Sequence, residues 1–142
     1  MTDLRKAFDD LVRFETMLWT AIDSKLQVNC GLTLSNFNVM LIIEATPECR
    51  VFDIAEALAI TVGGTSQAVD RLEAAGRCVR RPHPTDRRSS IVELTPDAVE
   101  VLRHAKPAFD GELSRLIREP LSIADLTRFT NSLDKLRRSA AH

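Results

Sequence analysis

The stretch from Phe52 to Gly76 constrains the fold most, because it places two short helix patterns on either side of a glycine pair. The segments "FDIAEALAI" and "GTSQAVDRLEAAG" repeat apolar residues at helical spacing, and the "TVGG" between them breaks the pattern. Two helices of about 8 and about 12 residues joined by a tight glycine-containing turn are typical of a helix-turn-helix. The apolar residues expected to face inward are Ile54, Ala55, Leu58, Ala68, Val69 and Leu72.

Strand patterns follow the second of these helices. The segments "CVRRP" and "SSIVELT" have the composition of strands and flank the turn "HPTD". A β-hairpin in this position predicts a winged helix-turn-helix, in which the hairpin is the wing. Pro82 and Pro84 stiffen the wing, and neither has to donate a hydrogen bond if it lies at a strand end.

Helix patterns also flank this lobe on both sides. We expect helices over residues 2–28 and 35–45, a long helix from Pro96 to about Ile117 that kinks near Pro107, and a last helix that begins at Ser122. The predicted fold class is therefore mainly α with a small β-wing. A single domain over residues 1–142 would comprise a winged helix-turn-helix lobe (33–95) and N- and C-terminal dimerisation helices (1–32 and 96–142).

The terminal helices carry apolar stripes that fall outside the compact lobe. Such stripes need a partner surface, and a symmetric homodimer supplies one. The alternative is that these helices pack back on their own lobe. The residues of the stripes are Leu4, Phe8, Leu11, Leu18 and Ile22 near the N-terminus, and Leu126, Phe129, Leu133 and Leu136 near the C-terminus.

Positive charge is concentrated in one short window of a chain whose formal net charge is -1. Residues 71–88 contain six arginines against Glu73 and Asp86, which gives this window a net charge of +4. A local basic cluster of this kind favours binding of a polyanion, whereas the alternative is a solvated charged loop.

Several function classes find no support in the sequence. The chain has no apolar run of the ~18–20 residues that a membrane span needs, and its N-terminus is charged from residue 3, so we expect a cytoplasmic protein without membrane contact. Three cysteines in no CxxC pattern predict neither disulfides nor a metal site. Motifs for hydrolases, metalloproteases and dinucleotide binding are missing, so we expect no enzymatic activity and no cofactor.

Two motifs of the chain resemble the MarR family of transcriptional regulators. These motifs are "DIAEALAITVGGTSQAVDRLEAAG" and "DRRSSIVELTP", and the second matches the family's wing signature through Asp86, Arg88, Leu94 and Thr95. The resemblance implies a dimeric winged-helix DNA-binding protein, usually a repressor, whose DNA affinity is lowered by a small ligand or by oxidation. It also implies that Arg88 enters the minor groove and that Asp86 supports it.

The residues themselves predict how double-stranded DNA would be bound. The second helix of the helix-turn-helix would enter the major groove, where Gln67 can pair with adenine and Ser66 can donate or accept. Gly63 and Gly64 would let the backbone approach DNA, or they only form a turn. Arg81 and Arg87 would lie near phosphates, and the alternative for Asp86 and Arg88 is that they only hold the wing together. The predicted DNA-binding residues are Gly64, Ser66, Gln67, Arg71, Arg81, Arg87 and Arg88, with Asp86 as wing support.

The sensing mechanism is the least constrained part of the prediction. The family's peroxide sensors use a cysteine near the start of the first helix with tyrosine partners, whereas this chain has no tyrosine and Cys30 lies at the far end of that helix. We therefore expect a small, partly apolar effector, with Glu15 and Trp19 as candidate ligand-binding residues. The alternative is that Trp19 belongs to the core of the dimer interface and that Glu15 pairs with an arginine of the other copy. For the function as a whole, the alternative is a winged-helix protein-interaction module without DNA-binding activity.

Overall fold

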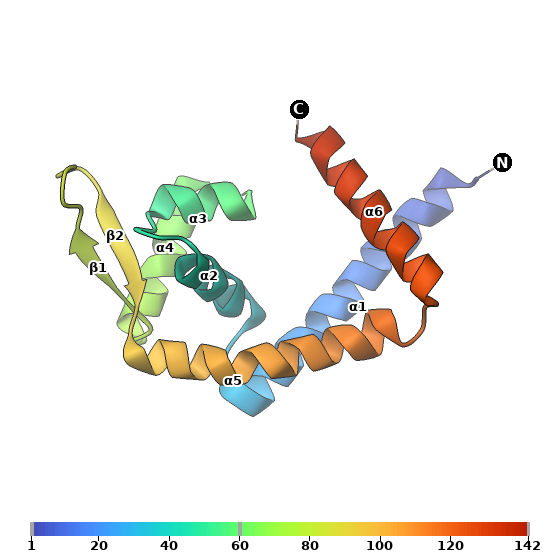
Figure 1. The fold of residues 1–142 in the computed structure, drawn as a ribbon, viewed down its shortest axis with the longest axis horizontal. Helices are drawn as coiled ribbons and strands as arrows, with labels where there is room; N and C mark the ends of the chain where they lie inside the picture. Colours follow the sequence, from blue (N-terminus) through green and yellow to red (C-terminus); the bar gives the residue numbers. More distant parts are fainter. Residues whose placement is uncertain (1, 60, 142) are drawn as a thin grey trace. The chain divides into compact units, whose positions relative to one another are not determined.

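The computed structural model describes residues 2–59 and 61–141, and its helices and strands follow the predicted order (Figure 1). The last residue of the predicted third helix, Ile60, lies outside the described residues. The elements are α1 (Leu4–Cys30), α2 (Leu34–Ala45), α3 (Val51–Leu58), α4 (Val62–Ala74), β1 (Cys78–Pro82), β2 (Ser90–Leu94), α5 (Pro96–Leu113), a π-helical turn (Ser114–Arg118) and α6 (Ile123–Ala140).

The chain divides into two compact units. One unit comprises Asp23–Ala108 and the other combines Met1–Ile22 with Phe109–His142. The unit that contains the helix-turn-helix is thus larger than the predicted lobe (33–95), because it includes the end of α1 and most of α5.

The core of the Asp23–Ala108 unit is built from the apolar faces of its helices and from β2. Thr33 caps α2 by accepting a hydrogen bond from the Asn36 amide at 3.1 Å. The predicted inward residues of α3 and α4 are buried, except that Leu58 and Ala68 are only half-buried. The largest buried side chains include Leu26, Phe37, Met40, Ile54, Val69, Leu72, Val92 and Leu102.

The segment "TVGG" was predicted to separate α3 from α4, and this prediction placed the start of α4 two residues too late. Thr61 caps α4, so the helix begins at Val62 and both Gly63 and Gly64 lie inside its first turn. Thr65 follows and is fully buried, with its hydroxyl donating to the Thr61 carbonyl at 2.9 Å. A Thr–Val sequence before two glycines is compatible with a helix start because a threonine cap stabilises the first turn even where glycine is a poor helix former.

The wing is an antiparallel hairpin anchored at its base. Gly76 ends α4 with a φ of 74°, and the Arg77 amide donates to the Leu72 carbonyl at 2.8 Å. In the hairpin Arg80 is opposite Val92, and the Val92 amide donates at 2.7 Å to the carbonyl of Cys49 in the loop before α3. Thr95 caps α5, and its hydroxyl also donates to the Gly76 carbonyl at 2.8 Å.

Pro107, near which a kink is predicted, lies inside α5. α5 continues past Pro107 to Leu113, and the departure from α-helical geometry is the π-helical turn at Ser114–Arg118. Ser122 caps α6 by accepting from the Asp125 amide at 3.1 Å, as predicted.

The other unit exposes much of its apolar surface. Leu4, Phe8 and Leu11 of α1 are exposed, whereas Ile22 is buried and does not belong to the exposed stripe that was predicted. On α6 Leu136 is exposed, and Leu126, Phe129 and Leu133 are half-buried. Among the described residues no single helix is long and apolar enough to cross a membrane, and only the sharply bent pair of α1 and α2 passes that test by length and composition.

Candidate nucleic-acid interface

The N-terminal end of α4 exposes polar side chains and, at Gly63 and Gly64, backbone that no side chain covers. The Gly64 amide donates to Thr61 Oγ1 at 3.1 Å, and Gly63 has open space around it. Gln67 and Arg71 are exposed and lie one turn apart, so they share a face of the helix. Within the described residues neither side chain has a hydrogen bond or an ion pair, so both are free to contact a ligand. A helix N-terminus also favours an anion.

Arg80 fixes the wing to α4. Its guanidinium lies 2.7 Å from Asp70 Oδ1 and 3.1 Å from Glu73 Oε1, and it donates to the Ser66 carbonyl at 3.4 Å. The Arg80 side chain is only 23% exposed. Two of the acids near the basic window are therefore used to neutralise this arginine, and Ser66 is held through its backbone at the place where α4 meets the wing.

Arg81 is also paired within the chain. Its guanidinium contacts the Glu93 carboxylate of the opposite strand, and both side chains are about half exposed. For Arg81 to lie near a phosphate as predicted, either its ion pair with Glu93 would open or its guanidinium would bind Glu93 and the phosphate together. The second arrangement is possible because a guanidinium has further donors beyond those facing Glu93.

Arg87 and Arg88 lie in the turn of the wing, where both are exposed and neither has an ion pair among the described residues. Asp86, which is predicted to support the wing, makes contacts in this turn with both of its carboxylate oxygens. Its Oδ1 accepts a hydrogen bond from the backbone amide of Arg88 at 3.0 Å, while its Oδ2 lies 3.6 Å from Arg50 Nη1. Asp86 thus fixes the backbone of Arg88 and leaves the guanidinium unpaired.

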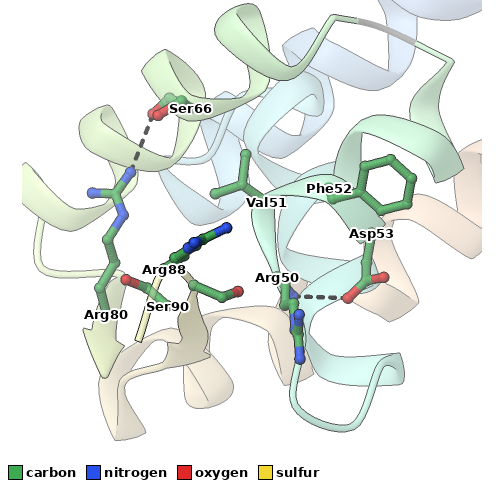
Figure 2. Close-up of a pocket in the computed structure, with 9 residues that line it drawn as sticks. Arg50, Val51, Phe52, Asp53, Ser66, Arg80, Arg88 and Ser90 are labelled. Atoms are coloured by element: carbon green, nitrogen blue, oxygen red, sulfur yellow. Dashed lines mark hydrogen bonds between the residues drawn. The ribbon is translucent and has the colours of Figure 1, made fainter. Parts of the chain in front are cut away.

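Three arginines and three serines surround a groove of about 450 Å³ between α3, α4 and the wing (Figure 2). Arg50 is the functional candidate that the sequence reasoning missed. It precedes α3 directly, and its amide donates to Asp53 Oδ2 at 2.9 Å in the manner of a helix cap. The available signal was an acid, Asp53, three residues after Arg50 and within the first turn of α3. The polar residues lining the groove are Arg50, Arg80, Arg88, Asp53, Ser66, Ser89 and Ser90.

Glu15 and Trp19 line a shallow hollow of about 390 Å³ on α1 with Thr16 and Thr20. Trp19 is 42% exposed. All four lining residues come from the same face of one helix. An enclosed ligand pocket at this place would therefore need a wall from another surface.

Two of the three cysteines are poorly suited to sensing. Cys49 and Cys78 are buried, and burial raises the pKa of each thiol to about 11, assisted by the charge of Asp53 for Cys49 and of Glu73 for Cys78. Cys30 is half-buried. In the part of the chain that the structure describes, no three metal-ligating side chains come together.

The sequence and the structure are both similar to known proteins. Residues 32–90 match the model of the MarR family. The multiple antibiotic resistance protein MarR of Salmonella typhimurium is 28% identical over 81 residues, which cover 56% of each chain. The chain spans about half the length of the curated relatives that it matches.

Solved structures match over nearly the whole chain. The MarR family regulator AbsC from Streptomyces coelicolor superimposes with a TM-score of 0.90 at 22% identity, covering 99% of this chain and 97% of that one. The transcriptional repressor CouR, solved bound to a 23-mer DNA duplex, superimposes with a TM-score of 0.81 at 26% identity, covering 90% and 89%. The similarity to the MarR family thus covers residues 32–90 in sequence, and the fold is that of the MarR family regulator AbsC over nearly the whole chain.

Proposed function

We propose that this chain is a sequence-specific transcriptional regulator that binds a pseudo-palindromic DNA site as a homodimer in the cytoplasm, as a ligand-responsive repressor. One observation carries the proposal. The exposed polar face of α4 and the unpaired arginines of the wing, Arg87 and Arg88, belong to the same compact unit. The fold likeness to CouR, a repressor solved on a DNA duplex, supports the same function.

The N-terminal half of α4 would enter the major groove. Gln67 would form two hydrogen bonds to an adenine edge, and Arg71, one turn later, would contact a base or a phosphate. Gly63 and Gly64 would let the first turn of α4 approach the DNA backbone, because no side chain stands between it and a phosphate. Ser66, held by Arg80, would lie at the edge of this contact.

The wing would grip DNA beside α4. Arg88 would enter the minor groove, whose negative potential is enhanced where the groove is narrow. Arg87 would lie nearer to phosphates, which position a protein without specifying sequence. The hydrogen bond from the Arg88 amide to Asp86 would keep the turn in one conformation and so lower the entropy lost on docking.

A homodimer would cover the apolar residues that α1 and α6 expose. Two copies would also place two α4 helices on successive half-sites of a two-fold DNA sequence. The hollow beside Glu15 and Trp19 would then gain the second wall that it lacks in a single chain, and a small, partly apolar effector could be enclosed there.

The test is selection of bound fragments from the source genome, followed by titration of the recovered duplex at several salt concentrations. The proposal predicts tight binding to a pseudo-palindromic fragment, with affinity that falls steeply as salt rises. Weak binding without sequence preference, or no binding to any duplex, would contradict it. An interaction module of the same fold would capture a protein and leave duplex DNA unbound.

A further inference from the structure

Asp70 is an acidic residue on the surface of α4 to which the proposed DNA contacts give no role. Its side chain is 62% exposed. Because an α-helix turns by about 100° per residue, Asp70 lies about 60° to one side of Gln67 and Arg71 about 40° to the other. Gln67 thus stands inside an exposed arc of α4 that has an acid on one flank and an arginine on the other. A carboxylate in this place repels phosphates, so its presence on a DNA-facing arc calls for an explanation.

The carboxylate of Asp70 is fixed by the wing. Its Oδ1 lies 2.7 Å from Nη2 of Arg80, whose side chain is only 23% exposed. Glu73 holds Arg80 in turn, since its Oε1 lies 3.1 Å from Nη1 and its Oε2 accepts from the Arg80 amide at 3.2 Å. The same guanidinium donates to the Ser66 carbonyl at 3.4 Å. Arg80 therefore keeps the carboxylate of Asp70 at a defined place beside Gln67.

The charges of this cluster do not cancel. The carboxylates of Asp70 and Glu73 contribute -2 and the guanidinium of Arg80 contributes +1, which leaves a net charge of -1. Asp70 is the more exposed of the two acids, with 62% against 43% for Glu73. A carboxylate has two oxygens with about four acceptor sites, so the ion pair through Oδ1 leaves Asp70 able to accept a further hydrogen bond.

The edges of the bases in the major groove determine what such an acceptor can bind. A carboxylate only accepts, so it attracts an amino group and repels the carbonyl oxygens of guanine and thymine. Adenine places its N7 acceptor beside its amino group, whereas cytosine presents its N4 amino group as the only polar group of its edge. The carboxylate of Asp70 therefore suits a cytosine better than any of the other three bases.

We propose that Asp70 is a specificity-determining residue of α4, which selects a cytosine close to the base that Gln67 reads and weakens binding to sites without that cytosine. Arg80 is a positioning residue, because it acts on DNA through the carboxylate that it orients. Specificity of this kind comes from a cost imposed on wrong sites as well as from a gain at the right one. The inference rests on the proposed function, since it needs α4 in the major groove.

The test measures base preference rather than overall affinity. Each position of the recovered half-site is changed to all four bases, and competition binding is measured for wild type and for Asp70→Asn. Wild-type protein should prefer cytosine by about tenfold at one position. In Asp70→Asn this preference should fall below about threefold, because an amide both donates and accepts. Affinity of this variant for a random duplex should rise, because a negative charge near the phosphates has been removed.

Glu73→Gln is the matched control, since it removes the same charge from the same arginine one turn farther from the N-terminus of α4. This variant should keep the cytosine preference, whatever it does to thermal stability. Asp70→Ala serves as the second variant if Asp70→Asn does not fold, and it should lose the preference as well.

Three results would overturn the proposal while the proposed function stands. They are a wild type that prefers cytosine at no position, a cytosine preference that persists in the Asp70 variants, and an equal loss of that preference in Glu73→Gln. Absence of wild-type binding to every duplex would instead overturn the proposed function, and the role of Asp70 with it.

Discussion

At the scale of single residues, Gly63 and Gly64 are adjacent in α4 but have different surroundings. A Cβ on Gly64 would lie 3.1 Å from Oγ1 of Thr61, the atom that caps the helix, whereas a Cβ on Gly63 would meet nothing within 4 Å. We expect Gly63→Ala to raise the free energy of unfolding by about 0.4–1 kcal/mol. Gly64→Ala should give no gain, because displacement of the Thr61 cap costs about 1 kcal/mol. Chemical denaturation followed by circular dichroism measures both, and equal stabilisation by the two variants would show that the cap contact is unimportant.

The thiols of Cys49 and Cys78 should be inert in the folded protein. Their pKa values of about 11 leave almost no thiolate near neutral pH, and thiolate is the reactive form. A colorimetric thiol reagent should therefore modify at most Cys30 quickly, and the other two only on unfolding. Rapid reaction of all three in the native protein would contradict this expectation.

The same burial predicts the sign of a pH effect on stability. In the unfolded chain the thiols ionise near their ordinary pKa of 9.0, but in the folded protein they stay protonated until about 11. The unfolded state thus releases protons first, so the two thiols contribute a loss of stability as pH rises from about 9 to about 11.

The ion pairs of the arginines in residues 71–88 could not be predicted from the sequence. A count of charges in residues 71–88 treats six arginines alike. In the described part of the chain, however, Arg80 is bound to Asp70 and Glu73, while Arg87 and Arg88 have no ion pair. Arg81 pairs with Glu93, twelve residues later on the opposite strand of the hairpin, where Glu93 lies opposite Val79 and thus diagonal to Arg81. Such pairings depend on strand register and on how α4 meets the wing, which composition does not encode.

At the scale of elements, local patterns predicted the helices and the wing well. Caps at Thr33, Thr95 and Ser122 and the stop at Gly76 are short-range signals, and each marks a boundary in the structure. The start of α4 was missed because the cap at Thr61 starts the helix despite the two glycines that follow. The π-helical turn was missed because no local pattern in residues 114–118 indicates the wider turn. Arg50 was missed because its partners, His83 and Asp86, lie more than thirty residues away.

The face of α1 that carries Glu15 and Trp19 allows a direct test of effector binding. Trp19 is the only tryptophan of the chain, so indole fluorescence reports on this hollow alone. A small apolar molecule that releases DNA should change the emission, and Trp19→Phe should weaken its effect. Release of DNA with unchanged emission, together with a normal response of Trp19→Phe, would place the effector elsewhere.

At the scale of the whole molecule, the exposed apolar residues of α1 predict an obligate dimer. Phe8 is 69% exposed, and a charge at this position would be buried without a partner in a dimer interface. Phe8→Glu should therefore sediment as a monomer at micromolar concentration, whereas the wild type should sediment as a dimer. Val28→Glu is the matched control, since Val28 is 82% exposed on the same helix but belongs to the other compact unit. A wild-type protein that is a stable folded monomer would contradict the prediction.

The central claim is that α4 reads bases while the wing grips the DNA backbone and minor groove, and the salt dependence of binding tests it most directly. Affinities of Gln67→Ala and Arg88→Ala should be measured on the cognate and on a random duplex over a series of salt concentrations, with Arg103→Ala on α5 as a control arginine. Gln67→Ala should cost about 1–3 kcal/mol on the cognate duplex and little on random DNA, with an unchanged salt slope. Arg88→Ala should weaken binding to both duplexes and reduce the slope by about one unit for each arm of the dimer. If Arg88→Ala lowers thermal stability while its salt slope stays equal to that of Arg103→Ala, then Arg88 only holds the wing together and the claim is wrong.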